Sequence, residues 1–399
     1  MAFKYTNETD LSRVTNILGL NIHKCTKKEV VAFIEQKMCS NNLSWIATVN
    51  PELCLKALNH HQLKALINSA SLSVCDGIGT FFAAKIIHEP VPERICGSDI
   101  VNDICFHAEK HNKSVLFLGS TELTLNKLSR YLNKAYPKLT FYTDANIIKN
   151  DPHSYTLSTE RVKKNAPDVV CVALGAPYQE EYIAHYLSHI PSITLAIGIG
   201  GALDMIAGQK PRAPRILQSL GCEWLWRVCI EPQRINRIMN AVIVFPYIFL
   251  WYILRMRFCY RKNVIACIKN SNNDILVIER ADTPDHWQLP QGGIEKNETI
   301  QGAFLREMKE EAGLNNFSVQ KIVPSFFVYP WPKWHQLNRG YRGQKQSLVI
   351  ATISDTDTIT LDPVEAQKYA WVSTHNLIAT LHPIRQEMGV KLISYLAGL

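Results

Sequence analysis

Short apolar runs alternate with longer helix-like stretches along the first half of the chain. The runs at 45–49, 114–118, 168–174 and 193–199 are rich in β-branched or aliphatic residues, and several of them end near Gly or Asn. This alternation predicts an α/β domain built on a doubly wound, Rossmann-like parallel sheet with helices on its faces. Ligands of such sheets bind beyond the carboxyl ends of the strands, so candidate site residues are expected there.

The pattern changes after residue 262. Strand-like stretches at 264–268, 274–278, 325–328, 346–353 and 369–372 surround one clear helix-like segment at 299–312, with a turn at 270–273. Mixed strands with one or two helices predict an α+β sandwich. A chain of 399 residues also suits two domains. We therefore expect an N-terminal domain at 1–224, a joining segment at 225–262 and a C-terminal domain at 263–399.

The joining segment is rich in Trp, Arg and aliphatic residues. Its apolar run at 241–254 has 14 residues and contains Pro246, with basic residues on both sides. Because about 20 residues are needed to cross a bilayer, the run predicts a segment that lies in the membrane interface with its basic flanks at anionic headgroups. The alternative is a buried helix that packs the two domains together.

Charge and cysteine usage narrow the class of protein. The whole chain carries a formal net charge of +8, of which residues 263–399 contribute −1 and the part before them +9. A basic N-terminal part could meet nucleic acid, phosphorylated substrates or an anionic membrane, and charge alone does not choose between them. The 11 cysteines include no Cys-x-x-Cys pair, and no Cys/His spacing resembles a zinc site. With no signal-peptide pattern at the start, we expect a cytoplasmic protein with reduced cysteines, and disulfides are the alternative.

The helix-like segment near residue 300 carries a cluster of acidic residues. Glu307, Glu310 and Glu311 are three and four residues apart, so a helix presents their carboxylates on one face. Three like charges this close repel one another unless a cation neutralises them, and hard oxygen ligands suit Mg²⁺ or Mn²⁺. Arg306 can pair with a carboxylate and orient it, and Gly313 lets the helix end. A solvated acidic face is the plainer alternative, but it requires neither Gly292 nor Glu298.

The stretch 292–314 resembles the signature of Nudix hydrolases at every defining position. The matching residues are Gly292, Glu298, Arg306, Glu307, Met308, Glu310, Glu311, Gly313 and Leu314. The resemblance implies metal-assisted attack of water on phosphorus in a nucleoside-diphosphate-type substrate, with Glu310 and Glu311 as principal ligands and Glu307 as a ligand or base. The identity of the general base stays open, because it varies within the family.

Sequences around this signature are similar to one branch of the family, the RNA pyrophosphohydrolases and diadenosine polyphosphate hydrolases. The similar stretches are 286–294, 343–346, which includes Gln344, and 382–386. The resemblance implies substrate contacts at Gln344 and a further metal-binding carboxylate at Glu365. A nucleoside polyphosphate and an RNA 5′ end are both candidate substrates, although the near-neutral charge of this domain gives little support for a long RNA track.

Polar clusters also follow the apolar runs of the first domain. They lie at 48–52, 76–79, 94–99, 174–181 and 198–204. In this order they resemble the WecG/TagA/CpsF family of bacterial glycosyltransferases across about residues 18–242. The family resemblance implies transfer of an N-acetylmannosamine-type sugar from a UDP-sugar to a polyprenyl-diphosphate-linked acceptor, and no cofactor is expected for this reaction. It also implies a peripheral position at the inner face of the cytoplasmic membrane. A homo-oligomer is compatible with this resemblance.

The resemblance assigns roles to individual residues of this domain. Asp76 is the candidate base that takes the proton from the acceptor hydroxyl, and Thr48, Asn50 and Gln179 line the sugar and acceptor pocket. Four arginines are expected to hold diphosphate charge, a task that suits guanidinium groups: Arg94, Arg227, Arg234 and Arg237. Each assignment has a plainer alternative, since Asp76 could cap a helix and the arginines could form a solvated face.

The sequence thus predicts a fusion of two enzymes, a glycosyltransferase followed by a Nudix pyrophosphohydrolase. In the alternative, only the hydrolase is active and the basic first domain docks on a membrane or on RNA. That alternative predicts salt-sensitive binding to RNA or anionic vesicles without sugar transfer.

Overall fold

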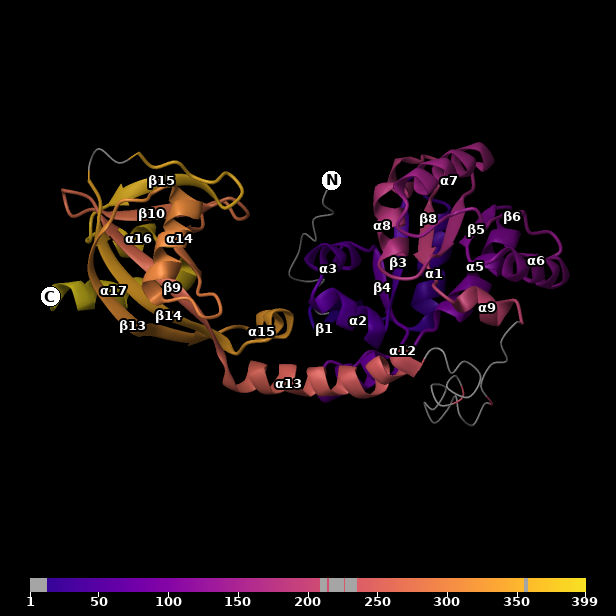
Figure 1. Cartoon of the computed structure of the whole chain (residues 1–399), viewed down its shortest axis with the longest axis horizontal. Coiled ribbons are helices and arrows are strands. Elements are labelled where there is room, and N and C mark those ends of the chain that lie inside the picture. The colour runs from indigo at the N-terminus through magenta and orange to yellow at the C-terminus, as the bar shows by residue number, and fades with distance from the viewer. Residues whose placement is uncertain (1–12, 209–213, 215–225, 227–234, 355–357) are drawn as a thin grey trace. The chain divides into compact units, whose positions relative to one another are not determined.

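The computed structural model describes residues 13–208, 214, 226, 235–354 and 358–399 (Figure 1). The chain divides into two compact units. Unit 1 runs to Ile253 and includes Leu337–Gly340, and unit 2 comprises Leu254–Gln336 and Tyr341–Leu399. Arg227 and Arg234, two of the arginines expected to hold diphosphate, lie outside the described residues.

Unit 1 is built on a six-stranded parallel sheet with the strand order β4-β3-β8-β7-β5-β6. Its strands are β3 (Ser44–Val49), β4 (Leu72–Cys75), β5 (Val115–Gly119), β6 (Phe141–Asp144), β7 (Val169–Ala173) and β8 (Leu195–Gly198). The sheet confirms the predicted doubly wound α/β class. An antiparallel hairpin of β1 (Val14–Ile17) and β2 (Leu20–His23) precedes it.

Helices connect the strands of unit 1. They are α1 (Lys27–Met38), α2 (Pro51–Leu58), α3 (His61–Asn68), α4 (Ile78–Ile86), α5 (Gly97–Lys110), α6 (Glu122–Ala135), α7 (Pro152–Asn165), α8 (Tyr178–His185), the short η2 (Leu187–His189) and α9 (Ala202–Ile206). Helices α1, α5, α6 and α9 contact one another in a chain, and so do α2, α3 and α8. The first group covers a large core of buried side chains from the sheet, including Ile46, Phe117 and Ile197.

A single helical rod follows, from Ile235 to Phe258. It consists of α12 (Ile235–Met239), a π-helical turn η4 (Asn240–Val244) and α13 (Phe245–Phe258). The apolar run at 241–254, predicted to be too short to cross a bilayer, lies within this longer helix of 24 residues, which passes through Pro246. In the π turn, the Phe245 N–H donates to the Asn240 carbonyl five residues back, and this local widening accommodates the proline ring.

Unit 2 is a mixed sheet enclosed by helices. Its strands are β9 (Tyr260–Lys269), β10 (Ile275–Arg280), β11 (Trp287–Gln288), β12 (Gln291–Gly293), β13 (Ser318–Pro330), β14 (Gly343–Thr352) and β15 (Ala366–Val372). Its helices are α14 (Ile300–Ala312), α16 (Leu377–Thr380), η5 (Pro383–Arg385) and α17 (Gln386–Ala397), and it also includes the start of α15 (Lys333–Arg339), whose last residues belong to unit 1. The central pair, β9 and β14, is parallel, and the other pairs are antiparallel.

Side chains alternate along β9 and thereby form two cores, as a strand buried on both faces requires. Ile265 and Cys267 pack with residues of α16 and α17, whereas Val264, Ala266 and Ile268 pack with residues of α14. Helices therefore cover both faces of the sheet, which confirms the predicted α+β sandwich.

Two candidate active sites

The first candidate site lies where the parallel strands of unit 1 end. Strands β4, β3, β8 and β7 are neighbours in the sheet and run in the same direction, so their carboxyl ends meet at one edge. Thr48 lies at the end of β3, Asp76 follows β4 and Gln179 follows β7 through a short loop. The structure thus brings these three predicted site residues to one edge of the sheet, where open α/β sheets bind ligands.

Thr48 and Gln179 meet around Gly198, the last residue of β8. The Thr48 hydroxyl donates to the Gly198 carbonyl at 3.1 Å. The Gln179 Oε1 accepts from the backbone N–H groups of Gly175 and Gly200, each at 3.0 Å. A Cβ atom on Gly198 would lie 2.6 Å from the Gln179 Nε2, so only glycine lets this side chain cross the strand end. The Gln179 side chain is therefore held in one orientation.

Asp76 connects the end of β3 with the start of α5. Its N–H donates to the Val49 carbonyl at 3.0 Å, and its Oδ1 accepts from the Gly97 N–H at 3.2 Å. The pKa of the adjacent Cys75 thiol is raised to about 11, chiefly by burial and also by the charge of Asp76, whereas the hydrogen bond with Thr80 and the charge of Arg94 act to lower it. Arg94 and Asp76 therefore both lie near this thiol, and opposite charges meet at the edge of the site.

Asn50 and Arg237 have other partners in this structure. The Asn50 side chain caps α2 by accepting from the Leu53 N–H at 3.0 Å. Arg237 donates through Nε and Nη2 to one carboxylate oxygen of Glu52, at 2.9 and 2.6 Å, and its side chain is half exposed. Burial would raise the pKa of Glu52, but its ion pairs with Arg237 and Lys56 outweigh burial and lower it.

Glu180 is a buried carboxyl group beside the site that the sequence reasoning did not single out. Its side chain is 2% exposed, and one oxygen accepts from the Gln179 Nε2 at 2.8 Å. Among the described residues, the other oxygen has no hydrogen-bond partner. Burial raises the pKa of Glu180 to about 7. The sequence shows Glu180 directly after Gln179, but it does not reveal that the Glu180 side chain is buried.

This raised pKa predicts a pH-dependent stability of unit 1. The folded chain keeps the Glu180 proton up to about pH 7, whereas the unfolded chain loses it near the ordinary value of 4.5, so stability falls as pH rises between the two. Glu180→Gln removes this loss and should stabilise the unit at pH 8 by roughly 1–3 kcal/mol, with little effect at pH 4. Calorimetric melting of both proteins at the two pH values tests this. Glu122→Gln, which changes an exposed carboxylate, is the control, and an equal effect of Glu180→Gln at both pH values would contradict the prediction.

The second candidate site is carried by α14 in unit 2. Thr299 caps this helix by accepting from the Gly302 N–H at 3.0 Å, and Gly313 ends it in the left-handed region at φ 67°. Within the helix, Glu311 is buried, Glu307 is mostly buried and Glu310 is more than half exposed. The three carboxylates thus range from the core to the surface.

The guanidinium group of Arg306 joins three glutamates and one backbone carbonyl around α14. Nε and Nη2 bind the two oxygens of Glu298 at 2.9 and 3.0 Å, and Nη2 also donates to the Gly293 carbonyl at 2.7 Å. Nη1 donates to Glu307 at 2.7 Å and to Glu310 at 3.2 Å. All five N–H groups of this arginine are therefore used within the protein.

Gly292 leaves room for the carboxylate of Glu307. A Cβ atom at this position would lie 1.7 Å from the Glu307 Cδ, which is impossible without moving the carboxylate. We therefore expect Gly292→Ala to displace Glu307 and to lower hydrolytic turnover about 100-fold, because a shift of about 1 Å in a reacting group has this effect. A comparison of turnover and far-ultraviolet circular dichroism checks it. Gly398→Ala, where the nearest atom is 3.7 Å away, is the matched control, and wild-type turnover of Gly292→Ala would contradict the steric argument.

Glu311 is the most buried of the clustered carboxyl groups, at 6% exposure, and accepts from the Gln291 N–H at 3.1 Å. Its pKa is raised to about 8, chiefly by burial and also by the charges of Glu365 and Glu307. Glu365 therefore faces the α14 carboxylates although it lies in another segment, just before β15. Burial and the charges of Glu310 and Glu365 also raise the pKa of Glu307. Neighbouring carboxylates that repel one another offer the hard oxygen ligands that a divalent cation prefers.

A row of glutamines borders this cluster and was only partly anticipated. Gln291 donates to Gln288 at 3.1 Å, and Gln346 donates to Gln291 at 2.8 Å. The predicted residue Gln344 lies two positions before Gln346 on the same side of β14 and accepts from the Tyr329 hydroxyl. The rings of His286, just before β11, and His382, just before η5, stack with a centroid distance of 4.1 Å. Gln346 could have been predicted from its position two residues after Gln344, since alternate residues of a strand lie on the same side.

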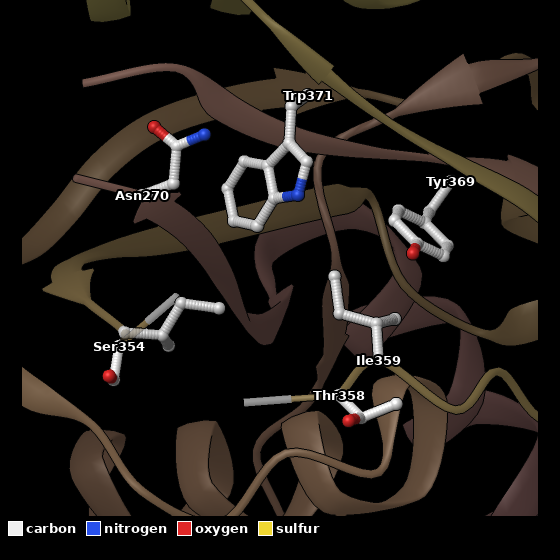
Figure 2. A pocket seen from close by; sticks show the side chains of 7 residues that line it. Asn270, Ser354, Thr358, Ile359, Tyr369 and Trp371 are labelled. Carbon is white, nitrogen blue, oxygen red and sulfur yellow. The ribbon is translucent and has the colours of Figure 1, made fainter. Parts of the chain in front are cut away.

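A pocket of about 320 Å³ in unit 2 does not coincide with either site. Figure 2 shows its labelled side chains around a common space, with the Trp371 ring between Asn270 and Tyr369. The remaining lining residues are Ile353, Ser354, Thr358 and Ile359. None of the predicted site residues lines it.

Two family models match the chain. The model described as the glycosyl transferase WecG/TagA/CpsF family matches residues 15–261, and the NUDIX domain model matches residues 260–392. A curated relative from Staphylococcus aureus (strain NCTC 8325 / PS 47), N-acetylglucosaminyldiphosphoundecaprenol N-acetyl-beta-D-mannosaminyltransferase, is 32% identical over 235 residues. The match covers 58% of this chain and 90% of the relative.

Solved structures are similar to the second part of the chain. An Ap4A hydrolase from C. elegans in a binary complex is 20% identical with a TM-score of 0.28, and the match covers 35% of this chain and 99% of that one. The E. coli dihydroneopterin triphosphate pyrophosphohydrolase is 19% identical with a TM-score of 0.27, and the match covers 33% and 95%.

Proposed function

The chain belongs to the WecG/TagA/CpsF family of glycosyl transferases and also carries a NUDIX domain, and from this premise we propose an enzyme with two activities. The first is transfer of an N-acetylmannosamine-type sugar from a UDP-sugar to a polyprenyl-diphosphate-linked acceptor. The second is metal-dependent hydrolysis of a pyrophosphate bond in a nucleoside polyphosphate or at an RNA 5′ end.

The transfer reaction is supported by the convergence of Thr48, Asp76 and Gln179 at one sheet edge. In the proposed step, an acceptor hydroxyl attacks the anomeric carbon, the new carbon–oxygen bond forms as the bond to UDP breaks, and the hydroxyl proton passes to Asp76. The Gly97 N–H bond to Oδ1 keeps the carboxylate in place for this step. Thr48 and Gln179, both fixed against Gly198, are proposed to line the sugar pocket.

Diphosphate charge is proposed to be held by Arg94 at the sheet edge and by Arg227, Arg234 and Arg237 after it. Arg237 supports this as a half-exposed guanidinium whose partner, Glu52, a diphosphate could replace. Asn50 is proposed to contribute through its position at the start of α2 beside the edge, in addition to capping that helix.

A membrane-surface location is supported by the helix Ile235–Phe258. It is long and apolar enough by length and composition to cross a bilayer, with a mean hydropathy of 1.7. One side of it, however, packs on protein, since Phe245, Phe249 and Tyr252 are buried. Exposed apolar side chains recur every three or four residues along its length, at Ile235, Met239, Ile243, Tyr247, Leu250, Trp251, Leu254 and Phe258. We therefore propose that this stripe lies in the inner face of the cytoplasmic membrane, where a lipid-linked acceptor is reached.

This location predicts a defect in a variant with charged residues on the stripe. Leu250→Glu with Trp251→Glu should weaken binding to anionic phospholipid vesicles by at least about 100-fold, because each large apolar side chain contributes about 1.5–3 kcal/mol on burial. Sedimentation with vesicles measures the change. The control is Leu123→Glu with Leu157→Glu, two exposed leucines on α6 and α7. Equal binding of the two double variants would contradict the location.

Hydrolysis is supported by the cluster of Glu307, Glu310, Glu311 and Glu365. These side chains are proposed to hold Mg²⁺ or Mn²⁺, which would polarise the phosphoryl group and offset the charge of the transition state. A water oxygen attacks phosphorus, the bridging phosphorus–oxygen bond breaks, and Glu307 or Glu310 accepts the proton of the water. Gln344 is proposed to contact the substrate.

A two-part assay on the full chain tests the proposal. Sugar transfer is measured with UDP-N-acetylmannosamine and a synthetic N-acetylglucosaminyl diphosphate polyprenol, and hydrolysis is measured with dinucleoside polyphosphates, nucleotide sugars and triphosphorylated RNA. We expect transfer without added metal and hydrolysis only with it. Absence of transfer combined with salt-sensitive binding to vesicles or RNA would favour the docking alternative for the first domain.

A further inference from the structure

Two helices of unit 1 meet at a cluster of nitrogen and oxygen ligands that the transfer reaction does not use. Glu35 lies on α1, and His107 and His111 lie one turn apart on α5. The two helices contact each other, and the two imidazole rings stack with a centroid distance of 6.4 Å and an angle of 14°. The spacing of four residues places both rings on the side of α5 that faces α1.

The ligand atoms of this cluster lie at distances that suit a small cation. The Glu35 Oε1 is 2.9 Å from the His107 Nδ1 and 3.1 Å from the His111 Nε2, and all three atoms lie within 4.8 Å of one another. In a tetrahedral site with bonds of about 2.0–2.1 Å, ligand atoms are about 3.4 Å apart. The two contacts of Glu35 are a few tenths of an ångström shorter than this spacing, and the two nitrogens lie within 4.8 Å of each other, so side-chain adjustments would place the three atoms around one ion.

His107 provides a second and independent observation. Its side chain belongs to a residue that is only 8% exposed, and its Nδ1 points into the cluster. Within the described part of the chain, this nitrogen forms no hydrogen bond of acceptable geometry, in spite of its closeness to Glu35. Buried polar atoms in native proteins generally bind a protein group, a water or an ion. A cation is one partner that this nitrogen could bind.

We propose that Glu35, His107 and His111 bind a zinc-class divalent transition-metal ion that ties α1 to α5. Two imidazoles and one carboxylate form a ligand set that such ions favour, whereas Mg²⁺ prefers oxygen ligands alone. Glu35 and His111 are each about one-third exposed, so a water can complete the coordination. The site differs in ligand chemistry from the carboxylate cluster of unit 2.

Lys110 is the competitor for this ion. Its Nζ donates to the same Glu35 oxygen at 2.8 Å, and its side chain is more than half exposed. Hydrogen bonds from Lys110 and His111 hold the pKa of Glu35 at about 2, so the carboxylate is ready to act as a ligand. An incoming cation must displace the lysine into solvent. Without metal, Lys110 would instead form a salt bridge that joins the two helices.

The location of the ion suggests its role. Helix α5 begins at Gly97, whose N–H donates to Asp76, and it ends at Lys110 beside the cluster. An ion that fixes the end of α5 to α1 would restrict movement of the helix whose first residue positions the candidate base. The ion is thus a structural support of unit 1, remote from the reacting atoms.

Cobalt binding to the full-length protein tests the site. The protein carries Glu310→Gln and Glu311→Gln, which removes the carboxylate cluster of unit 2, and is stripped with a chelator before titration with Co²⁺ and Zn²⁺. We expect one equivalent of Co²⁺ with the intense visible absorption of a four-coordinate ion, displacement by Zn²⁺ and a higher melting temperature with Zn²⁺. His111→Gln should weaken binding more than about 100-fold, since changes to outer partners alone cost about 10–100-fold.

Two further variants make the result decisive. His153→Gln, which changes an exposed histidine of α7, should bind like the parent protein. Lys110→Gln should bind Co²⁺ about 10-fold more tightly, because it removes the competing charge. The proposal is overturned if binding does not saturate below millimolar Co²⁺, if His111→Gln binds like the parent, or if Lys110→Gln only lowers the melting temperature without tightening the binding of metal.

Discussion

Replacing Glu311 by glutamine is expected to lower metal-dependent hydrolysis about 1,000-fold and to leave the fold of unit 2 intact. The loss arises because a neutral amide cannot neutralise the cation that stabilises the transition state, a contribution of several kcal/mol. The fold is retained because burial raises the pKa of Glu311 to about 8, so the group is already largely neutral without metal at pH 7. Glutamine also keeps an oxygen to accept from the Gln291 N–H.

Steady-state kinetics over a range of Mg²⁺ concentrations measure this effect. Glu310→Gln should give a comparable loss, whereas Glu387→Gln, an exposed carboxylate on α17, should retain wild-type rates. Sugar transfer should be unchanged in all three variants. Wild-type hydrolysis by Glu311→Gln would remove this residue from the proposed metal site.

Asp76→Asn is expected to reduce sugar transfer about 100- to 10,000-fold, the range that a positioned general base contributes. Asparagine keeps an oxygen that can accept from the Gly97 N–H, so the local hydrogen bond at the start of α5 survives. The substitution removes only the ability to take up a proton. The apparent affinity for the UDP-sugar should therefore change little while turnover falls.

Radiolabel transfer to the polyprenyl acceptor measures the effect, with hydrolysis by unit 2 as an internal check that the chain is folded. Glu160→Gln, an exposed carboxylate on α7, is the matched control. Transfer by Asp76→Asn at the wild-type rate would leave helix capping as the role of Asp76 and would require another base.

The sequence predicted elements best where side chains repeat regularly and are fully buried. Strands β3, β5, β7 and β8 were found within about two residues of their ends because every position in them is buried. Strand β6 was missed, since three of its four side chains are partly or fully exposed. Helix α17 was missed because the stretch 382–386 before it was interpreted only through its resemblance to the hydrolase family, and the apolar positions after it were not analysed for helical spacing.

Local chemistry was easier to foresee than contacts between distant segments. The clustering of Glu307, Glu310 and Glu311 followed from helical spacing, but the contact of the Glu307 carboxylate with Gly292 required the sheet to be in place. The same limit explains the histidines. The pair His107 and His111 has the four-residue spacing of two histidines on one face of a helix, but its third partner, Glu35, lies on a helix more than 70 residues earlier and was not foreseen.

The five hydrogen bonds of Arg306 determine how a substrate can be received in unit 2. Every donor of this guanidinium is committed to Glu298, Glu307, Glu310 or the Gly293 carbonyl. None is left to donate to a phosphate oxygen, so this guanidinium cannot hold an anionic substrate through hydrogen bonds. Nucleotide affinity itself, and not only turnover, should therefore depend on the concentration of divalent ions.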